Sequence, residues 1–178
     1  MIAIAITIMV LELRVPHGAD WAALRPVVPV LLTYALGFVF LGTYWNNHHH
    51  MLHATDRING KILWANLHLL FWLSLVPFVT RWVGESHFAP LPTAVYGGVL
   101  LLAAVAYLML TIAILALHGP SSRLAKAVGR ETKGKLSAAL YVVAIPLAFV
   151  SPWIAIGIYV FVALFWLIPD RRIESTIR

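Results

Sequence analysis

The sequence contains no cysteine and carries very little charge. Of its 178 residues, 61% are hydrophobic and only 11% are Asp, Glu, Lys or Arg. Without cysteine the chain can form no disulfide, no thiol nucleophile and no thiolate metal site. Soluble domains have about a quarter of their residues charged, which keeps their surfaces compatible with water. The composition therefore excludes an ordinary soluble protein and predicts an integral membrane protein.

Long apolar segments make up most of the chain, and short polar stretches separate them. We expect these segments to form six transmembrane helices, the second of which continues beyond the membrane to His53. The helices are expected at about residues 1–13, 24–44, 62–82, 93–117, 136–150 and 153–168. The sequence thus predicts an all-α integral membrane protein whose residues 1–178 form a single six-helix transmembrane domain.

The positive charges gather in particular linkers, which predicts how the chain crosses the membrane. The formal net charge is +6. Basic residues dominate the linker after the second helix, the linker GPSSRLAKAVGRETKGK before the fifth helix, and the C-terminal tail. Charges cancel in the linkers after the first and third helices. Because basic residues favour the cytoplasmic side of a membrane, we expect both termini to be cytoplasmic.

The first apolar segment is short for a transmembrane helix. Crossing the hydrocarbon core takes about 20 residues, and residues 1–13 supply roughly two-thirds of that length. A signal peptide would need a basic stretch before the segment and a small-residue cleavage site after it. The sequence contains neither the basic stretch nor the cleavage site. We therefore expect the natural helix to begin upstream of Met1, which the upstream genomic DNA would test.

Three motifs together carry a resemblance to a known family. They are IAIAITIMVLEL in the first helix, YWNNHHHMLH at the end of the second, and LWANLHLLFWLSLVPF in the third. This combination resembles the prokaryotic branch of the transmembrane protein 175 family, whose members are potassium-permeable channels without the usual filter loop. The Phe-Ser-Asp sequence that the family places before the first helix is not found here.

The resemblance implies a homotetramer in the inner (plasma) membrane of a prokaryote. The first helix of each subunit would surround a central axis, and potassium ions would pass through the lipid bilayer along that axis. Such a protein is not an enzyme, conducts passively, and needs neither a cofactor nor nucleic acid.

The resemblance also implies which residues would line the pore. Ile4 would form the tightest ring, with Thr7 and Leu11 further along. Their i, i+3, i+7 spacing independently places them on one stripe of a helix. No charged residue lies in the interior of the expected helices, away from their first and last turns, so selection would depend on constriction, dewetting and hydroxyl oxygens, with a modest preference for potassium over sodium. The alternative is that Thr7 bonds back to its own helix and faces another helix.

A second group of residues would support the pore helix. By resemblance, Trp45 and His48 of the second helix and Asn66 of the third would hold the inner half of the first helix. An amide buried in lipid needs a polar partner, so we expect Asn66 to bond across helices. Pro77 and the following phenylalanine are expected to pack and to end the third helix near its outer end.

The histidines at the end of the second helix raise an alternative function. His49, His53 and Asp56 have i, i+4, i+7 spacing, which would place them on one helix face where they could hold a divalent metal. A membrane metalloenzyme, such as a lipid desaturase or hydroxylase, is the first alternative. Enzymes of that kind need several histidine clusters, and this chain has one, so we expect no bound metal. A transporter and a non-conducting membrane scaffold stay open as further alternatives.

Overall fold

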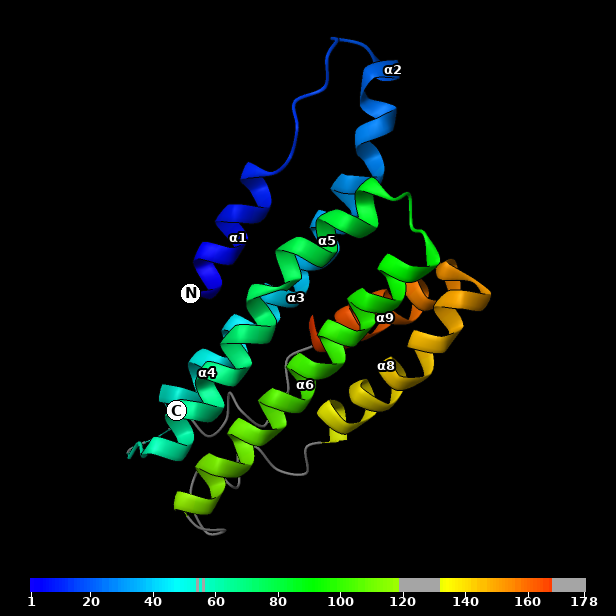
Figure 1. Ribbon diagram of the computed structural model, residues 1–178. Coiled ribbons are helices and arrows are strands. Elements are labelled where there is room, and N and C mark those ends of the chain that lie inside the picture. The colour runs from blue at the N-terminus through cyan, green and yellow to red at the C-terminus, as the bar shows by residue number, and fades with distance from the viewer. Residues whose placement is uncertain (54, 56, 119–131, 168–178) are drawn as a thin grey trace.

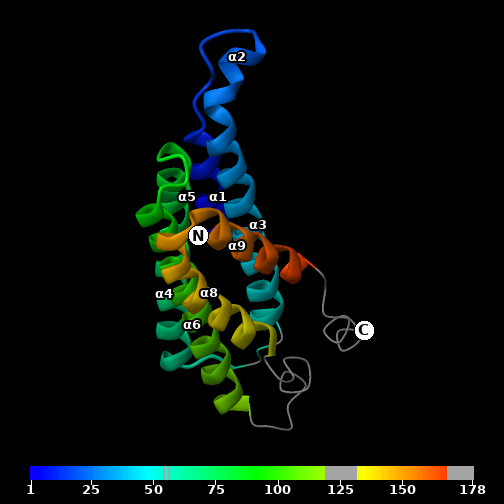
Figure 2. The same cartoon turned by 90° about the vertical axis from the view of Figure 1, so that its right-hand side faces the viewer.

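The computed structural model describes the chain except for residues 54, 56, 119–131 and 168–178. The described chain is built from helices (Figures 1 and 2). They are α1 (Ile2–Leu11), α2 (Trp21–Leu24), the 3-10 turn η1 (Arg25–Val27), α3 (Val28–His53), α4 (Gly60–Ser74), α5 (Val76–Glu85), α6 (Pro90–His118), α8 (Thr132–Val150) and α9 (Pro152–Leu167).

Each of the six predicted apolar segments contains a helix. Four stretches are long and apolar enough to cross a membrane: Trp21–His53, Gly60–Glu85, Pro90–His118 and Lys133–Val150. The apolar helices α1 and α9 are shorter than these. The predicted continuation of the second helix to His53 is confirmed by α3.

The third segment differs from the prediction. In place of one helix over 62–82, α4 ends at Ser74 and α5 begins at Val76, with Leu75 between them. Pro77 lies in the first turn of α5, where its missing N–H costs no helical hydrogen bond. The predicted helix end before Pro77 is therefore present, and what the sequence did not predict is that a second helix begins there. Arg81 and Glu85, which the sequence placed in a linker, belong to α5.

Helix α6 lies at the centre of the bundle and contacts α4, α5, α8 and α9. Helix α3 packs mainly along α5. The bundle has two contrasting edges: α1 lies at one edge against α3, α4 and α5, and α8 and α9 lie at the other (Figure 1). Helix α1 begins partway along the bundle, and a long linker joins it to α2.

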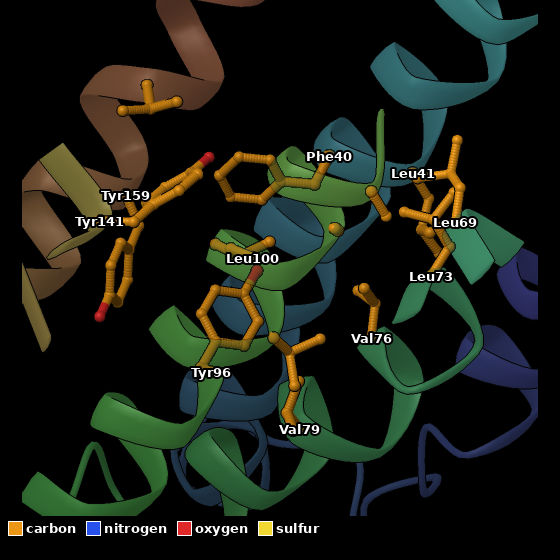
Figure 3. Packing of buried hydrophobic residues seen from close by; sticks show 14 of the residues in the cluster. Phe40, Leu41, Leu69, Leu73, Val76, Val79, Tyr96, Leu100, Tyr141 and Tyr159 are labelled. Atoms are coloured by element: carbon orange, nitrogen blue, oxygen red, sulfur yellow. The ribbon is translucent and has the colours of Figure 1, made fainter. Parts of the chain in front are cut away.

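An aromatic cluster fills the core between α6 and the α8–α9 edge (Figure 3). The rings of Tyr96 and Tyr159 lie 5.6 Å apart between centroids, and the Tyr159 hydroxyl donates to the Thr93 carbonyl at 3.2 Å. Gly97 allows this close approach of α6 and α9. A Cβ at Gly97 would lie 2.9 Å from Cζ of Tyr159, which is too close for unstrained contact.

The two ends of the bundle differ in charge. The top of Figure 1 holds α2 and the linker before it, with the α5–α6 loop and the α8–α9 turn below them, and the lower end holds the connection between α3 and α4. The α5–α6 loop and the α8–α9 turn meet through Phe88 and Trp153. At the upper end the described basic residues Arg14, Arg25 and Arg81 match the acidic residues Glu12, Asp20 and Glu85. The described charged residues at the lower end are Arg57, Lys61, Lys133 and Lys135, all basic.

Candidate functional site

Helix α1 is apolar on both of its faces. Ile2, Ala5 and Met9 are buried against the rest of the chain. The opposite face is exposed, with 62% of Ile4 and 77% of Leu11 accessible. A helix that packs against one neighbour in water normally has a polar outer face. The outer face of α1 therefore suits contact with lipid or with another chain rather than with water.

The three predicted pore residues lie on this exposed face. Ile4, Thr7 and Leu11 are all exposed in the single chain. The exposed surface is wider than the predicted stripe, because Ile8 and Val10 are exposed as well. Apart from the Thr7 hydroxyl, these side chains are aliphatic, so this face offers ions and water almost no polar contact.

Thr7 combines features of both interpretations that the sequence allowed. Its hydroxyl donates a hydrogen bond to the Ala3 carbonyl of its own helix at 3.0 Å. Its side chain nevertheless lies on the exposed face and not against another helix of the chain. Because the hydroxyl proton is used within the helix, the oxygen lone pairs are free to accept. The hydroxyl is thus oriented as an acceptor, as a cation ligand must be.

A hollow of about 600 Å³ lies beside the exposed face of α1. Aliphatic and aromatic side chains line most of it, and charged groups line its upper part. Its lining includes Ile4, Ile8, Glu12, Pro77, Phe78 and Arg81. The hollow therefore continues the apolar surface of α1 onto α5.

The upper end of α1 is joined to α5 by an ion pair that the sequence did not reveal. Glu12, the residue that follows the last turn of α1, lies with its carboxylate 3.2 Å from Nη1 of Arg81. Nε of Arg81 lies 3.0 Å from the carboxylate of Glu85. Sequence reasoning treated these charges as a cancelling set in linkers. The i, i+4 spacing of Arg81 and Glu85 was the signal that they share a helix.

The predicted hydrogen bond of Asn66 across helices is present. Nε2 of His48 on α3 lies 2.6 Å from Oδ1 of Asn66 on α4, and both side chains are half-buried. Asn66 precedes Ser74, which lines the hollow beside α1, by eight residues, or about 12 Å along a helix. The pair therefore ties α3 to α4 lower in the bundle and fixes two of the helices on which α1 packs.

Trp45 does not join the pair formed by His48 and Asn66. Its ring stacks on His49 with 5.6 Å between centroids, and about half of its surface is exposed. The rings of His49 and His53 lie 4.7 Å apart. Asp56, the third member of the predicted metal-binding face, lies outside the described residues. Among the residues that the structure does describe, no group of three metal-ligating side chains comes together.

These observations define the class of protein: an all-α membrane protein. Comparison with known proteins then identifies its family. The model of the endosomal/lysosomal potassium channel TMEM175 family matches residues 1–77, which hold α1, α3, α4 and the start of α5.

Relatives extend the match to the whole chain. A potassium channel from Chryseobacterium sp. (strain P1-3) is 51% identical over 178 residues, covering all of this chain and 93% of the relative. A potassium channel from Streptomyces collinus is 32% identical over 116 residues, covering 59% of this chain and 55% of that relative.

A solved structure shares the fold. The crystal structure of a lysosomal potassium-selective channel TMEM175 homologue from Chamaesiphon minutus superposes with a TM-score of 0.75 at 26% identity. The match covers 93% of this chain and 90% of that one. The chain therefore belongs to the TMEM175 family of potassium channels. Because the family consists of channels, the chain is not an enzyme, and the metalloenzyme alternative is excluded.

Proposed function

We propose that the chain is the subunit of a homotetrameric potassium channel that has six membrane-spanning helices and conducts passively. In this assembly α1 of each subunit lines a central pore, with rings of Ile4, Thr7 and Leu11. The observation that carries the proposal is the exposed aliphatic face of α1, interrupted by an outward hydroxyl, on the edge of a subunit that belongs to a potassium channel family.

The chemistry of this face explains how conduction would work. A ring of Ile4 side chains excludes water, so dewetting at the ring sets the barrier and closes the path when the helices approach one another. The Thr7 oxygens replace part of the hydration shell of a potassium ion above that ring. Since the face carries no charge, ions bind weakly, leave readily, and are only modestly selected over sodium.

The support of the pore helix is the second part of the proposal. His48 and Asn66 hold α3 and α4 in register, and α1 packs on both helices. Trp45 acts from the same end of α3 by stacking on the histidine next to His48. These residues do not touch the permeant ion. They keep the helices that carry α1 in place.

The orientation follows from the charges at the two ends of the bundle. The described cations Arg57, Lys61, Lys133 and Lys135 lie at the lower end, whereas charges cancel at the upper end. The positive-inside rule then makes the lower end cytoplasmic and the upper end external. With six spans, both termini lie in the cytoplasm, and the membrane is the plasma membrane of a prokaryote.

Ion flux out of liposomes tests the proposed function. Purified protein reconstituted in vesicles with an outward potassium gradient should generate an inside-negative potential that a voltage-sensitive dye reports. The same vesicles with an outward sodium gradient should give a smaller potential. Protein-free vesicles are the control for leakage. A non-conducting scaffold would leave both signals at the level of these empty vesicles, and the proposal would then be wrong.

A further inference from the structure

The attachment of α1 to the rest of the subunit differs along its length. Its lower part is held by burial of Ile2 and Ala5, and Met9 is the last buried residue before the helix ends. After Leu13 the chain has no regular structure until Asp20 caps α2. The upper end of α1 therefore leads into a long linker that cannot itself hold the helix in position.

A polar side chain attaches the upper end of α1, where burial does not. Of the polar side chains in residues 1–13, Thr7 bonds within its own helix and Glu12 reaches α5. The Glu12 carboxylate pairs with one nitrogen of the Arg81 guanidinium while Glu85 accepts from another. A guanidinium is a rigid planar fork, so the bond to Glu85 orients the remaining nitrogen toward Glu12. Arg81 is thus pre-positioned to receive the end of α1.

The ion pair is also correctly placed to act on the pore. Glu12 directly follows Leu11, the uppermost of the proposed pore residues. Glu12 and Arg81 line the same hollow as Ile4 and Ile8. Both side chains of the pair are about one-third exposed, so the pair is partly shielded from water at the edge of the bundle. A shift of Glu12 relative to Arg81 would carry Leu11 with it.

We propose that the Glu12–Arg81 ion pair is a latch that fixes the outer end of the pore helix to α5. Glu12 and Arg81 are positioning residues for conduction, and neither one binds the permeant ion. The inference rests on the proposed function, since it assigns the latch a role in a pore lined by α1. When the latch is closed, the rings of Leu11 and Thr7 keep their spacing. When it is broken, the outer half of α1 moves and the conducting geometry is occupied less of the time.

Four variants test the latch. Glu12→Gln and Arg81→Gln each remove one partner, and the double variant removes both. Asp20→Asn is the matched control, because it removes the same charge at the same end of the bundle. Asp20 accepts from the Ala23 amide as the cap of α2, and asparagine caps a helix equally well. The control therefore changes the local charge without touching the latch.

The first measurement follows the position of the helix end directly. The chain has no cysteine, so a single Val15→Cys substitution allows one nitroxide label three residues after Glu12. We expect Glu12→Gln and Arg81→Gln to narrow the electron paramagnetic resonance line shape, which reports greater label mobility. Asp20→Asn should leave the line shape as in the chain that carries the labelled Val15→Cys substitution alone. Equal mobility in Glu12→Gln and Asp20→Asn would overturn the latch.

The second measurement follows potassium flux in liposomes. Each single variant should lower the flux roughly twofold, the scale that a partly exposed ion pair supports. The double variant should lower it no further, because partners in one interaction are not additive. Effects that multiply in the double variant would overturn the latch. If the line shapes change as expected while the unmodified protein passes no potassium, the attachment of α1 stands and the proposed function fails.

Discussion

The two edges of the bundle are built in opposite ways. At the α8–α9 edge, large side chains are buried: Tyr159 is fully enclosed, packs against Tyr96 and Tyr141, and bonds to α6 through its hydroxyl. At the α1 edge, the buried side chains are few, and Ile4 and Leu11 project away from the chain. Both edges expose apolar side chains, Val142 and Leu164 among them at the α8–α9 edge, so the two edges differ in how much they bury and not in what they expose.

This difference separates stability from function. The α6 centre and the α8–α9 edge bury enough aromatic and aliphatic surface to define the subunit by itself. Helix α1 buries few side chains and is joined to α5 by an ion pair at its upper end. An element that must change position as a channel opens is expected to be weakly attached. The predictions below change the α1 edge, the contact of α6 with the α8–α9 edge, and the histidine cluster.

The largest effect is expected from polar substitution in the proposed constriction. Ile4→Asn should wet the narrowest ring and raise the potassium current while reducing selectivity over sodium. If the barrier at the ring falls by about 1.4 kcal/mol, the current rises about tenfold. Val142→Asn is the matched control, since Val142 is an exposed aliphatic residue on α8 at the other edge. Planar-bilayer recordings of both variants measure the potassium current and its selectivity over sodium. Equal currents in the two variants would remove Ile4 from the pore.

The second effect concerns stability at the opposite edge. Gly97→Ala should lower the free energy of unfolding by about 1–3 kcal/mol, because the added Cβ collides with Tyr159. Gly98→Ala is the control: no atom lies within 4 Å of its added Cβ, and alanine favours helix by up to about 1 kcal/mol. Thermal unfolding in detergent measures both variants. A Gly97→Ala variant as stable as Gly98→Ala would contradict the packing described for α6 and α9.

A smaller effect is expected from removal of the proposed ion ligand. Thr7→Val keeps the shape of the side chain but removes its oxygen. Loss of a neutral oxygen contact worth about 1 kcal/mol lowers the potassium current about fivefold. Thr7→Ser keeps the oxygen and should conduct like the unmodified chain. If valine and serine at position 7 gave the same current and selectivity, Thr7 would have a packing role alone.

The smallest effect is expected at the histidine cluster. His49→Ala should leave permeation and stability nearly unchanged, because His49 is exposed and only stacks with Trp45 and its neighbouring histidines. His48→Ala should cost about 1–3 kcal/mol of stability by leaving the half-buried Asn66 amide without its partner. The free energy of unfolding and the potassium flux are measured for both variants, which compares the exposed His49 with the half-buried His48. Loss of flux in His49→Ala alone would reverse this assignment.

Much of the fold could be predicted from the sequence. Sparse charge and long apolar runs require a bilayer, and the same runs give the positions of the helices to within a few residues. The break at Leu75 could not be predicted in this way. Pro77 predicted an end to the third helix, and α4 does end before it, but the sequence did not predict that α5 would begin at once.

Part of the candidate site could also be predicted. The family resemblance implied Ile4, Thr7 and Leu11, and helical spacing agreed with it. The need of a buried amide for a partner predicted that Asn66 bonds across helices. The stacking of Trp45 on His49 and the joining of Glu12 to Arg81 did not follow, because each depends on the distance between side chains that spacing alone does not fix.

The sequence by itself determined the solvent of this protein, the identity of its helices and the apolar character of its first helix. Those properties depend on the composition of the chain and on the spacing of its apolar residues, which are local features of the sequence. Only the tertiary structure decided that α1 lies at an open edge and that Glu12 meets Arg81. Such contacts join residues far apart in sequence, and their geometry is set by the packing of α1 against α3, α4 and α5.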